Sequence, residues 1–408
     1  MAVLVFPQLG QSYSVLTHEQ IVDLLWKDQI QPLLLKRFPK STDDDLRKAH
    51  AYAYGGCVIQ DMGYYPFGNH YFSDLVHYVR SGDFVENLLR DSSDLNEYAF
   101  ALGALSHYAA DNSGHPTINR VVAIEFPKLR KKYGDSVTYA EDPKAHIRTE
   151  FGFDMAQVAR NRYTSDRYHD FIGFEVSKEL LERSFQETYD IKLSDVFADL
   201  DLAIGSYRRS VSRLIPGMTR VALLSRKDQL IKEVPNFDRK KFLYNLSRSD
   251  YNKEWGTKYR RPGLGTRILA FFLKLVPKIG PFKAIGFEIP TPQTEDLYIK
   301  SINVTVDDYS SRLRAASKPD FHLPNLDFDT GREAVAGEYS LADNTYARLL
   351  DDLSKDDFKI VSKDVKTNVV KFYADGKPSS AEKDSKQLQN KLELLKAHVP
   401  DPPAPAAN

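Results

Sequence analysis

The sequence has very little cysteine and no excess of charge of either sign. Cys57 is the only cysteine among 408 residues, so no disulfide can form within the chain and a metal site built from several thiolates is excluded. Lysine plus arginine equals aspartate plus glutamate at 56 each, which gives no argument for a polyanionic partner such as nucleic acid. Any metal ion must therefore be held by histidine and carboxylate side chains.

Long apolar runs are also missing. None approaches the roughly 20 residues that a membrane-spanning helix needs, so we predict no transmembrane segment. The composition, 42% apolar and 27% charged, is typical of a globular chain with one large domain or two ordinary ones. Residues 1–12 resemble the end of a secretion signal, although they are short and lack a basic start; an ordinary chain terminus is the alternative. We expect a signal remnant, and hence a secreted or periplasmic protein.

Helical patterns dominate the first half of the chain. Thr17 and the pair Ser41-Thr42 are candidate N-caps for two helices that end at Pro32 and at Gly55-Gly56. Strand signals are weak here, so the predicted fold class is mainly α. Residues 58–74, which include Asp61 and His70, are rich in aromatic and turn-forming residues and are predicted to form a structured loop. Further helices are expected at 94–110, around 146–154, at 176–189 and at 194–225.

The chain changes character near residue 226. The predicted C-terminal extension, 226–376, contains the apolar segment 267–287 with three interspersed lysines, which either lies in a membrane surface or packs as a helical hairpin. Residues 297–313 are expected to begin with a strand, and an amphipathic helix is expected from Ser340. The tail, 377–408, is charged and predicted to hold a lone amphipathic helix and a disordered end.

The histidines are concentrated in the first part of the chain, where eight of ten lie between residues 18 and 169. His107 with Asp111, and His146 with Glu150, are four residues apart, so on helices each pair would direct an imidazole and a carboxylate to one spot. This ligand set suits zinc, and two or three ions close together would clamp a phosphoryl group. Taken singly, each histidine is better explained by a structural role or a surface position, but taken together they favour a metal site, without naming a reaction.

Three motifs, HYAAD at 107–111, the HP of NSGHP at 115–116 and HIRTE at 146–150, give residues 13–225 a resemblance to a known family. The segment resembles the zinc-dependent phospholipase C family, which includes bacterial phosphatidylcholine-hydrolysing phospholipases and clostridial alpha-toxin. That family shares its helical fold with fungal single-strand nucleases. The resemblance implies a multi-helix catalytic domain at 13–225, two or three zinc ions, and a helical C-terminal extension.

The resemblance also implies the metal ligands, in three sets. The first zinc would be held by Asp61, His70, His107 and Asp111; the second by His115, His146 and Glu150; the third by His18, by Asp111 as a bridge, and by the amine and carbonyl of a terminal Tyr13. A free amine at Tyr13 requires removal of residues 1–12. The sequence departs from the family pattern in that Asp111 and His115 are two residues closer together, while the interval from His115 to His146 is longer.

The implied activity is metal-assisted hydrolysis of a phosphodiester, with Asp61 either a proton acceptor for the attacking water or only a ligand. Phospholipid is the first expected substrate. A single-strand nuclease or nucleotidase of the same fold, for which nucleic acid would be the partner, and a zinc-binding surface protein without turnover are the alternatives. The pattern does not require His77. Nearby aromatic residues either line a substrate channel or pack in the core: Tyr64, Tyr65, Phe67 and Tyr71.

Overall fold

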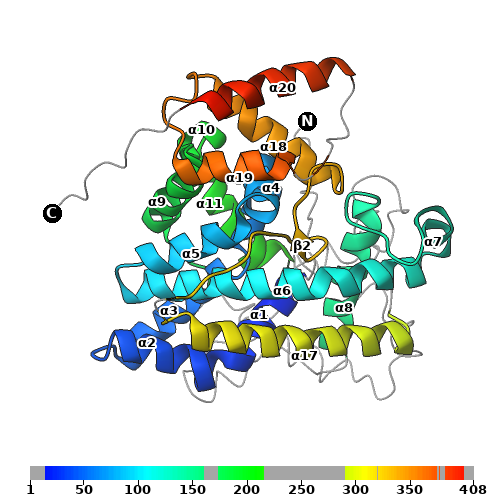
Figure 1. Ribbon diagram of the computed structural model, residues 1–408. Coiled ribbons are helices and arrows are strands. Elements are labelled where there is room, and N and C mark those ends of the chain that lie inside the picture. Colours follow the sequence, from blue (N-terminus) through cyan, green and yellow to red (C-terminus); the bar gives the residue numbers. More distant parts are fainter. Residues whose placement is uncertain are drawn as a thin grey trace, which may run out of the picture.

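A computed structural model describes residues 14–159, 173–215, 290–318, 320–374, 376 and 382–398. Helices form nearly all the regular structure of these ranges, and their two strands make one short hairpin, which confirms the predicted mainly α fold. Figure 1 shows the long helix α6 (Leu95–Glu125) crossing the middle of the molecule, with α17 (Pro292–Ala315) beside it. The other elements are arranged around this pair.

The first helix starts earlier than predicted. Helix α1 (Val15–Leu25) has Ser14 at its N-cap position, so Thr17 lies in the first turn instead of capping the helix. The chain continues through a π-helical turn, η1 (Trp26–Ile30), into α2 (Gln31–Arg37). Pro32 lies in the first turn of α2 and does not break the helix, because that turn does not need the N–H that proline lacks.

Helix α3 (Asp43–Gly56) begins where the sequence predicts, because Thr42 and Asp45 form a reciprocal capping box. It crosses α6 so closely that there is no room for side chains at the contact. A Cβ atom at Gly56 would lie 2.0 Å from the carbonyl oxygen of Phe100, and one at Gly103 would lie 2.1 Å from that of Ala53. Glycine is therefore required on both helices, and the crossing fixes the position of α6.

Helix α6 extends beyond its predicted end at residue 110 and passes through Pro116 without ending. A proline inside a helix leaves the carbonyl four residues earlier without its backbone partner and usually kinks or breaks the helix. Here α6 is buried along most of its length against α3, α17 and α8, and this packing outweighs the local penalty. As a result His107, Asp111 and His115, spaced i, i+4 and i+8, share one face of a continuous helix.

The other elements up to residue 215 pack around α3 and α6. The predicted helix at 176–189 is confirmed by α9, whereas the helix predicted at 194–225 is divided into shorter pieces as far as the structure describes it. The predicted loop contains a 3-10 helix and the start of α4. The bounds are η2 (Ile59–Tyr64), α4 (His70–Tyr78), α5 (Ser81–Asp91), α7 (Pro127–Tyr133), α8 (Pro143–Ala159), α9 (Lys178–Tyr189), α10 (Leu193–Val196), α11 (Leu200–Arg209) and η4 (Ser210–Leu214).

The prediction that a strand begins the segment 297–313 is wrong, because this segment lies in α17. Its β-branched residues are typical of a strand, yet its buried residues recur every three to four positions: Tyr298, Ile302, Thr305, Tyr309 and Leu313. Helix α17 runs antiparallel to α6. Thr294 bonds to Glu125 at one end, and the Tyr309 hydroxyl donates to the Leu102 carbonyl over 2.9 Å near the other. Packing on α6 overrides the local strand preference.

The rest of the C-terminal part returns to the centre of the molecule and then forms three helices. Strands β1 (Leu326–Asp327) and β2 (Arg332–Glu333) pair antiparallel. Helix α18 (Ser340–Ser354) begins at Ser340 as predicted, and α19 (Lys363–Ala374) and α20 (Glu382–Ala397) follow it. Helix α20 confirms the helix predicted in the tail, and Figure 1 shows it lying over α18 and α19.

Several predictions lie outside the described residues. They concern the signal remnant at 1–12, Tyr13, the apolar segment 267–287 and the chain end beyond residue 398. In the ranges that the structure describes, no helix combines the length and the apolar character needed to cross a membrane. The predicted division at residue 225 is not tested by these observations.

The α3–α6 crossing gives a test of the fold. Gly103→Ala should lower the free energy of unfolding by about 1–3 kcal/mol, because the added methyl group meets the Ala53 carbonyl and the helices must move apart. Gly205→Ala is the matched control in α11, where nothing lies within 4 Å of the added Cβ; it should be neutral or stabilising by up to about 1 kcal/mol. Urea denaturation of both variants measures the difference. Equal effects would contradict the close crossing.

Candidate metal centre

Three groups of buried histidine and carboxylate side chains lie along α6, and α6 contributes to each of them. The ligand atoms within each group lie within 4.8 Å of one another. Helix α1 adds His18, η2 adds Asp61, α4 adds His77, and α8 adds the other two members of the last group. The groups are His18, His107 and Asp111; Asp61, His77 and His107; and His115, His146 and Glu150.

Asp111 joins the first two groups. Its Oδ1 atom lies 3.6 Å from His18 Nε2, and its Oδ2 atom lies 3.1 Å from His107 Nε2 and 3.6 Å from His77 Nε2. Asp61 Oδ1 lies 3.5 Å from the same His77 atom. The Asp111 carboxylate thus turns one oxygen towards His18 and the other towards His77 and His107.

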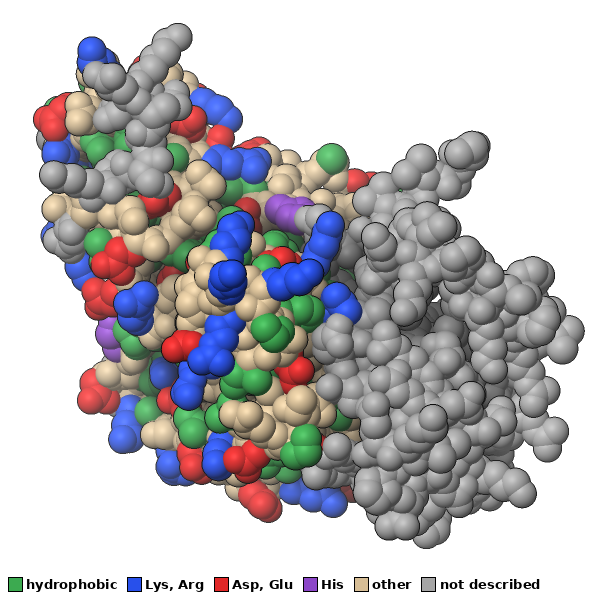
Figure 2. Space-filling view, turned by 90° about the vertical axis from the view of Figure 1, so that its right-hand side faces the viewer, with side chains coloured by type: hydrophobic (Ala, Val, Ile, Leu, Met, Phe, Trp, Pro, Cys, Tyr) green, Lys and Arg blue, Asp and Glu red, His purple; other side chains and the backbone are tan. Residues whose placement is uncertain are grey.

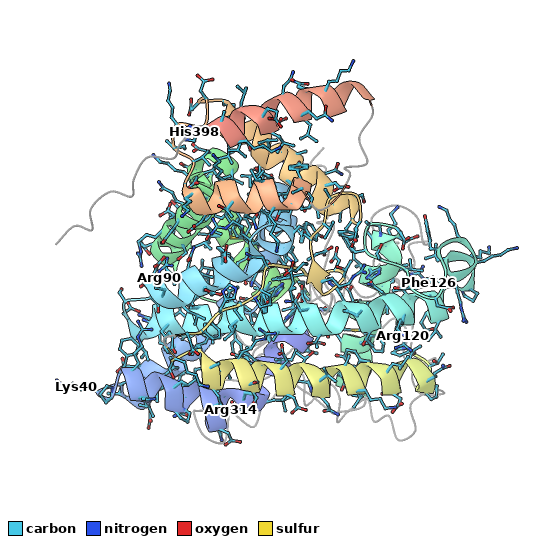
Figure 3. The ribbon with its side chains drawn as sticks, viewed as in Figure 1. Lys40, Arg90, Arg120, Phe126, Arg314 and His398 are labelled. Atoms are coloured by element: carbon cyan, nitrogen blue, oxygen red, sulfur yellow. The ribbon has the colours of Figure 1, made fainter. Side chains whose placement is uncertain are left out.

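The third group lies where α6 passes α8, towards the end of α6 that Arg120 and Phe126 mark in Figure 3. His146 Nδ1 is 3.4 Å from Glu150 Oε1, one turn further along α8. His115 faces them from α6, with its ring centroid 6.2 Å from that of His146. The shorter interval between Asp111 and His115 is a single helical turn, so it keeps His115 on the same face of α6 as Asp111.

Most of these separations are too long for good hydrogen bonds, whose N···O distances are about 2.7–3.2 Å. They match a different geometry. Two atoms that each lie about 2.0–2.1 Å from a tetrahedral zinc ion are about 3.3–3.4 Å apart. The separations of 3.4–3.6 Å from His18, His77 and His146 to their carboxylate neighbours are close to this edge length.

The histidines are oriented by their second ring nitrogens. His107 Nδ1 donates to the Cys57 carbonyl over 3.0 Å, and His77 Nδ1 to that of Ser73 over 2.7 Å. His146 Nε2 donates to the Val137 carbonyl over 2.6 Å. A carbonyl can only accept, so each neutral imidazole has its lone pair on the nitrogen that faces the group. Metal-binding histidines are usually held in this way.

Four polar groups that face these sites make no hydrogen bond within the described part of the chain. They are the Asp61 carboxylate, His115 Nε2, His146 Nδ1 and Glu150 Oε1. Each residue is at most 3% exposed, and a buried polar atom without a partner costs about 1–3 kcal/mol. Three of the four belong to the third group and converge there. This donor set fits a zinc ion, which would satisfy all of them at once.

Burial keeps several of these groups uncharged. It lowers the pKa of His18 to about 3, with help from the neighbouring His107. Burial, with His115 nearby, also lowers the pKa of His146 to about 4. Both imidazoles are therefore neutral at pH 7, which is the form that binds metal. Burial raises the pKa of Glu150 well above its ordinary value, so without a cation this carboxyl carries a proton.

His77 and Asp111 behave as a charged pair. Burial lowers the pKa of His77, but the negative charges of the nearby Asp111 and Asp61 carboxylates outweigh burial and leave that pKa well above 6.5. Burial raises the pKa of Asp111, but the nearby imidazoles, above all His107, bring it well below 3.8. In the absence of a metal ion, the proton on His77 balances the charge on Asp111. A bound cation would take over this role.

The structure does not bring His70 to the groups. His70 is the first residue of α4, exposed at the surface, and its ring packs edge-on against Tyr64 with centroids 5.2 Å apart. His77 lies seven residues later on the same side of α4 and about 10 Å deeper, and it occupies the place expected for His70. Asn69 caps the helix and so fixes where α4 begins.

The zinc set predicted to involve His18, Asp111 and Tyr13 can be followed only in part. His18 and Asp111 come together as expected, whereas Tyr13 lies outside the described residues. The start of α1 is held by Asp154, whose carboxylate accepts from Leu16 N over 3.1 Å and from the Thr17 hydroxyl over 2.7 Å. Asp154 thus positions the turn that carries His18, and its role as a ligand is not indicated.

Sequence reasoning missed the segment that covers the first two groups. The Phe328 ring lies against His77 and His107, with centroids 5.1 and 6.1 Å away, and its backbone N–H donates to the His77 carbonyl over 3.2 Å.

The four aromatic residues considered as a channel lining differ in their exposure. Tyr64, Tyr65 and Tyr71 are buried, which fits core packing. Phe67 alone of the four is exposed.

Fold and site together define a mainly α domain with buried histidine and carboxylate groups of the kind that hold zinc. Residues 17–199 match the family model described as zinc dependent phospholipase C. The match confirms the resemblance to the zinc-dependent phospholipase C family seen in the motifs, over somewhat less than half of the chain. Comparison with curated proteins and with solved structures gives no match. Helix α17, the β hairpin and α18–α20 lie beyond the matched residues.

Two histidines of one helix give a matched test of the ligand set. His77→Ala should remove about one zinc ion per chain, because His77 Nε2 lies 3.5 Å from both Asp61 and His107. His70→Ala should leave the zinc content unchanged, because His70 lies at the surface. Elemental analysis after dialysis measures both variants, with circular dichroism as the check on folding. Loss of zinc from the His70 variant alone would restore the sequence-based ligand set.

Zinc loading should also release protons. At pH 7 without metal, His77 and Glu150 carry protons because of their raised pKa values, and both must lose them to bind zinc. We expect net proton release, and an apparent affinity that falls as the pH is lowered. Calorimetric titration in buffers of different ionisation enthalpy measures the release. Glu150→Gln should lower it, and proton uptake on loading would contradict the assignment.

Proposed function

We propose that this protein is a zinc-dependent phospholipase C-type hydrolase that cleaves a phosphodiester bond in a phospholipid. The family match to residues 17–199 supports hydrolysis of phosphodiesters. One observation of the structure carries the rest of the proposal. Buried atoms of His115, His146 and Glu150 converge at separations that suit zinc, and within the described ranges they have no hydrogen-bond partner.

Each residue has a role in this proposal. Zinc, when bound, supplies Lewis-acid stabilisation of the phosphoryl oxygens and lowers the pKa of a water molecule. His115, His146 and Glu150 would hold one ion, and the groups at His18, Asp61, His77, His107 and Asp111 would hold any further ions. Asp61 is the candidate proton acceptor for the attacking water, because neither of its carboxylate oxygens has a hydrogen-bond partner in the described chain. Positioning and charge stabilisation supply most of the catalysis of such reactions.

A basic surface close to the end of α6 supports a phosphate-bearing substrate. Helix α7 follows α6 directly and carries four exposed cationic residues, and Figure 2, which faces that side of the molecule, shows Lys and Arg side chains among apolar ones. They are Lys128, Arg130, Lys131 and Lys132. Such a patch attracts phosphates of lipid and of nucleic acid alike, so it does not separate the two substrates.

Two alternatives make different predictions. A single-strand nuclease or nucleotidase would use aromatic side chains to stack bases, and in the described chain Phe67 is the one exposed aromatic residue near η2 and α4. A zinc-binding protein without turnover would bind the ions and hydrolyse nothing. We favour phospholipid because the family match names a phospholipase. Contact of residues 267–287 with a membrane surface and secretion stay predictions of the sequence.

A comparison of substrates tests the proposal. The zinc-loaded protein should release phosphocholine from phosphatidylcholine vesicles faster than it degrades single-stranded DNA. Glu150→Gln should lower that rate by at least about 10–100-fold, the range already caused by losing residues that only support metal ligands. Glu179→Gln, on the exposed side of α9, is the control and should retain full activity. Cleavage of DNA alone would favour the nuclease, and bound zinc without cleavage of either substrate would contradict an enzyme.

A further inference from the structure

Residues 324–331, at the β hairpin, lie beyond the family match yet contact the metal-binding face of α6 directly. The Tyr108 hydroxyl donates to the Pro324 carbonyl over 2.7 Å, and the Asn119 side chain donates to the Asp329 carbonyl over 2.9 Å. A Cβ atom at Gly331 would lie 2.7 Å from the Asn112 carbonyl, and its φ of +68° is a conformation that favours glycine. The hairpin is therefore packed on the turns of α6 that carry Asp111 and His115.

The Asp329 carboxylate reaches His115 from this hairpin. Its Oδ1 atom lies 3.0 Å from His115 Nδ1, and the Phe328 carbonyl lies 2.9 Å from the same nitrogen. Neither group can donate a proton, so His115 carries its proton on Nδ1, where it bonds to the Phe328 carbonyl with the Asp329 carboxylate beside it. The lone pair is then on Nε2, the buried atom that has no hydrogen-bond partner among the described residues and faces His146 and Glu150.

Asp329 is itself held in place. Its Oδ2 atom accepts from the Tyr78 hydroxyl over 2.8 Å and from the Tyr339 hydroxyl over 2.5 Å. Burial raises the pKa of both hydroxyls, so they remain protonated and donate. With one oxygen fixed by two tyrosines and the other directed at His115, the carboxylate has a single orientation, and its side chain is only 3% exposed.

This carboxylate distinguishes His115 from the other histidines of the centre. His77, His107 and His146 each use a backbone carbonyl as the acceptor for the second nitrogen. His115 differs from these three in that its second nitrogen also lies beside a carboxylate. A carboxylate partner fixes the tautomer of the imidazole and raises its basicity, and both effects favour metal binding.

We propose that Asp329 is a positioning residue for the metal ion of His115, His146 and Glu150, supplied by a segment outside the family-matched domain. This inference rests on the proposed zinc site. It explains why a hairpin more than a hundred residues beyond the matched segment packs on α6. The carboxylate of Asp329 orients His115 and so supports the ion that His115 would bind. Asp329 itself does not contact that ion.

The test compares two buried aspartates of the same hairpin. Asp329→Asn should lower the affinity for one zinc ion by about 10–100-fold and leave the other sites unchanged. Asp327→Asn is the control, because the hydrogen bonds recorded for the Asp327 side chain stay within the hairpin. Burial beside Asp329 raises the pKa of Asp327 to about 8, so the amide replaces a largely neutral group. His115→Ala identifies which ion is lost. Zinc per chain is measured by elemental analysis after dialysis against graded chelator.

The outcomes separate this inference from the proposed function. Loss of the same ion from the Asp329→Asn and His115→Ala variants, with the control unchanged, supports it. Full zinc affinity in Asp329→Asn while His115→Ala loses an ion overturns it and leaves the hydrolase proposal intact. No zinc in the unaltered protein would overturn both.

A variant that keeps the charge guards against misfolding. Asp329→Glu retains the carboxylate, so this variant should hold the ion of His115, His146 and Glu150 more tightly than Asp329→Asn does. If Asp329→Asn does not fold, as judged by circular dichroism, Asp329→Glu is compared with the Asp327→Asn control and should bind a nearly full complement of zinc. If a folded Asp329→Glu variant lost the ion of the His115 site to the same extent as His115→Ala, the inference would be overturned.

Discussion

Burying ionisable side chains together is unfavourable unless each charge and lone pair is matched, and this constraint governs the centre of the molecule. His18, Asp61, His107 and Asp111 are entirely shielded from solvent, and the members of the third group nearly so. Without a cation the centre relies on the proton of His77 and on a protonated Glu150. With a cation those protons are unnecessary, so folding and metal binding are linked in this protein.

The close crossing of α3 and α6 makes this arrangement possible. Because glycines replace side chains at the contact, the end of α3 lies near enough for the Cys57 carbonyl to accept from His107. The same backbone contact leaves the face of α6 that carries Asp111 turned towards α1, α4 and α8. A wider crossing would misplace three residues together, because His107, Asp111 and His115 are fixed on one rigid helix.

The parts of the site that the sequence could predict are those encoded locally. A spacing of four residues is sufficient to pair His107 with Asp111 and His146 with Glu150, because both pairs lie within single helices. The choice between His70 and His77 depends on where α4 begins and how deeply it enters the core, which the spacing alone does not determine. The strand prediction for α17 failed for a similar reason, since contact with α6 decided its conformation.

Phe328 and Asp329 carry no recognisable pattern in the sequence, because their role depends on chain segments that meet only in the folded protein. Their placement has a consequence for biosynthesis. The His115 site is complete only after the hairpin has been made, long after α6 and α8 leave the ribosome. Until then, His77 and His107 lack their aromatic cover and His115 lacks the carboxylate beside it. The proposed role of Asp329 therefore implies that stable zinc uptake at this site follows synthesis of the C-terminal part of the chain.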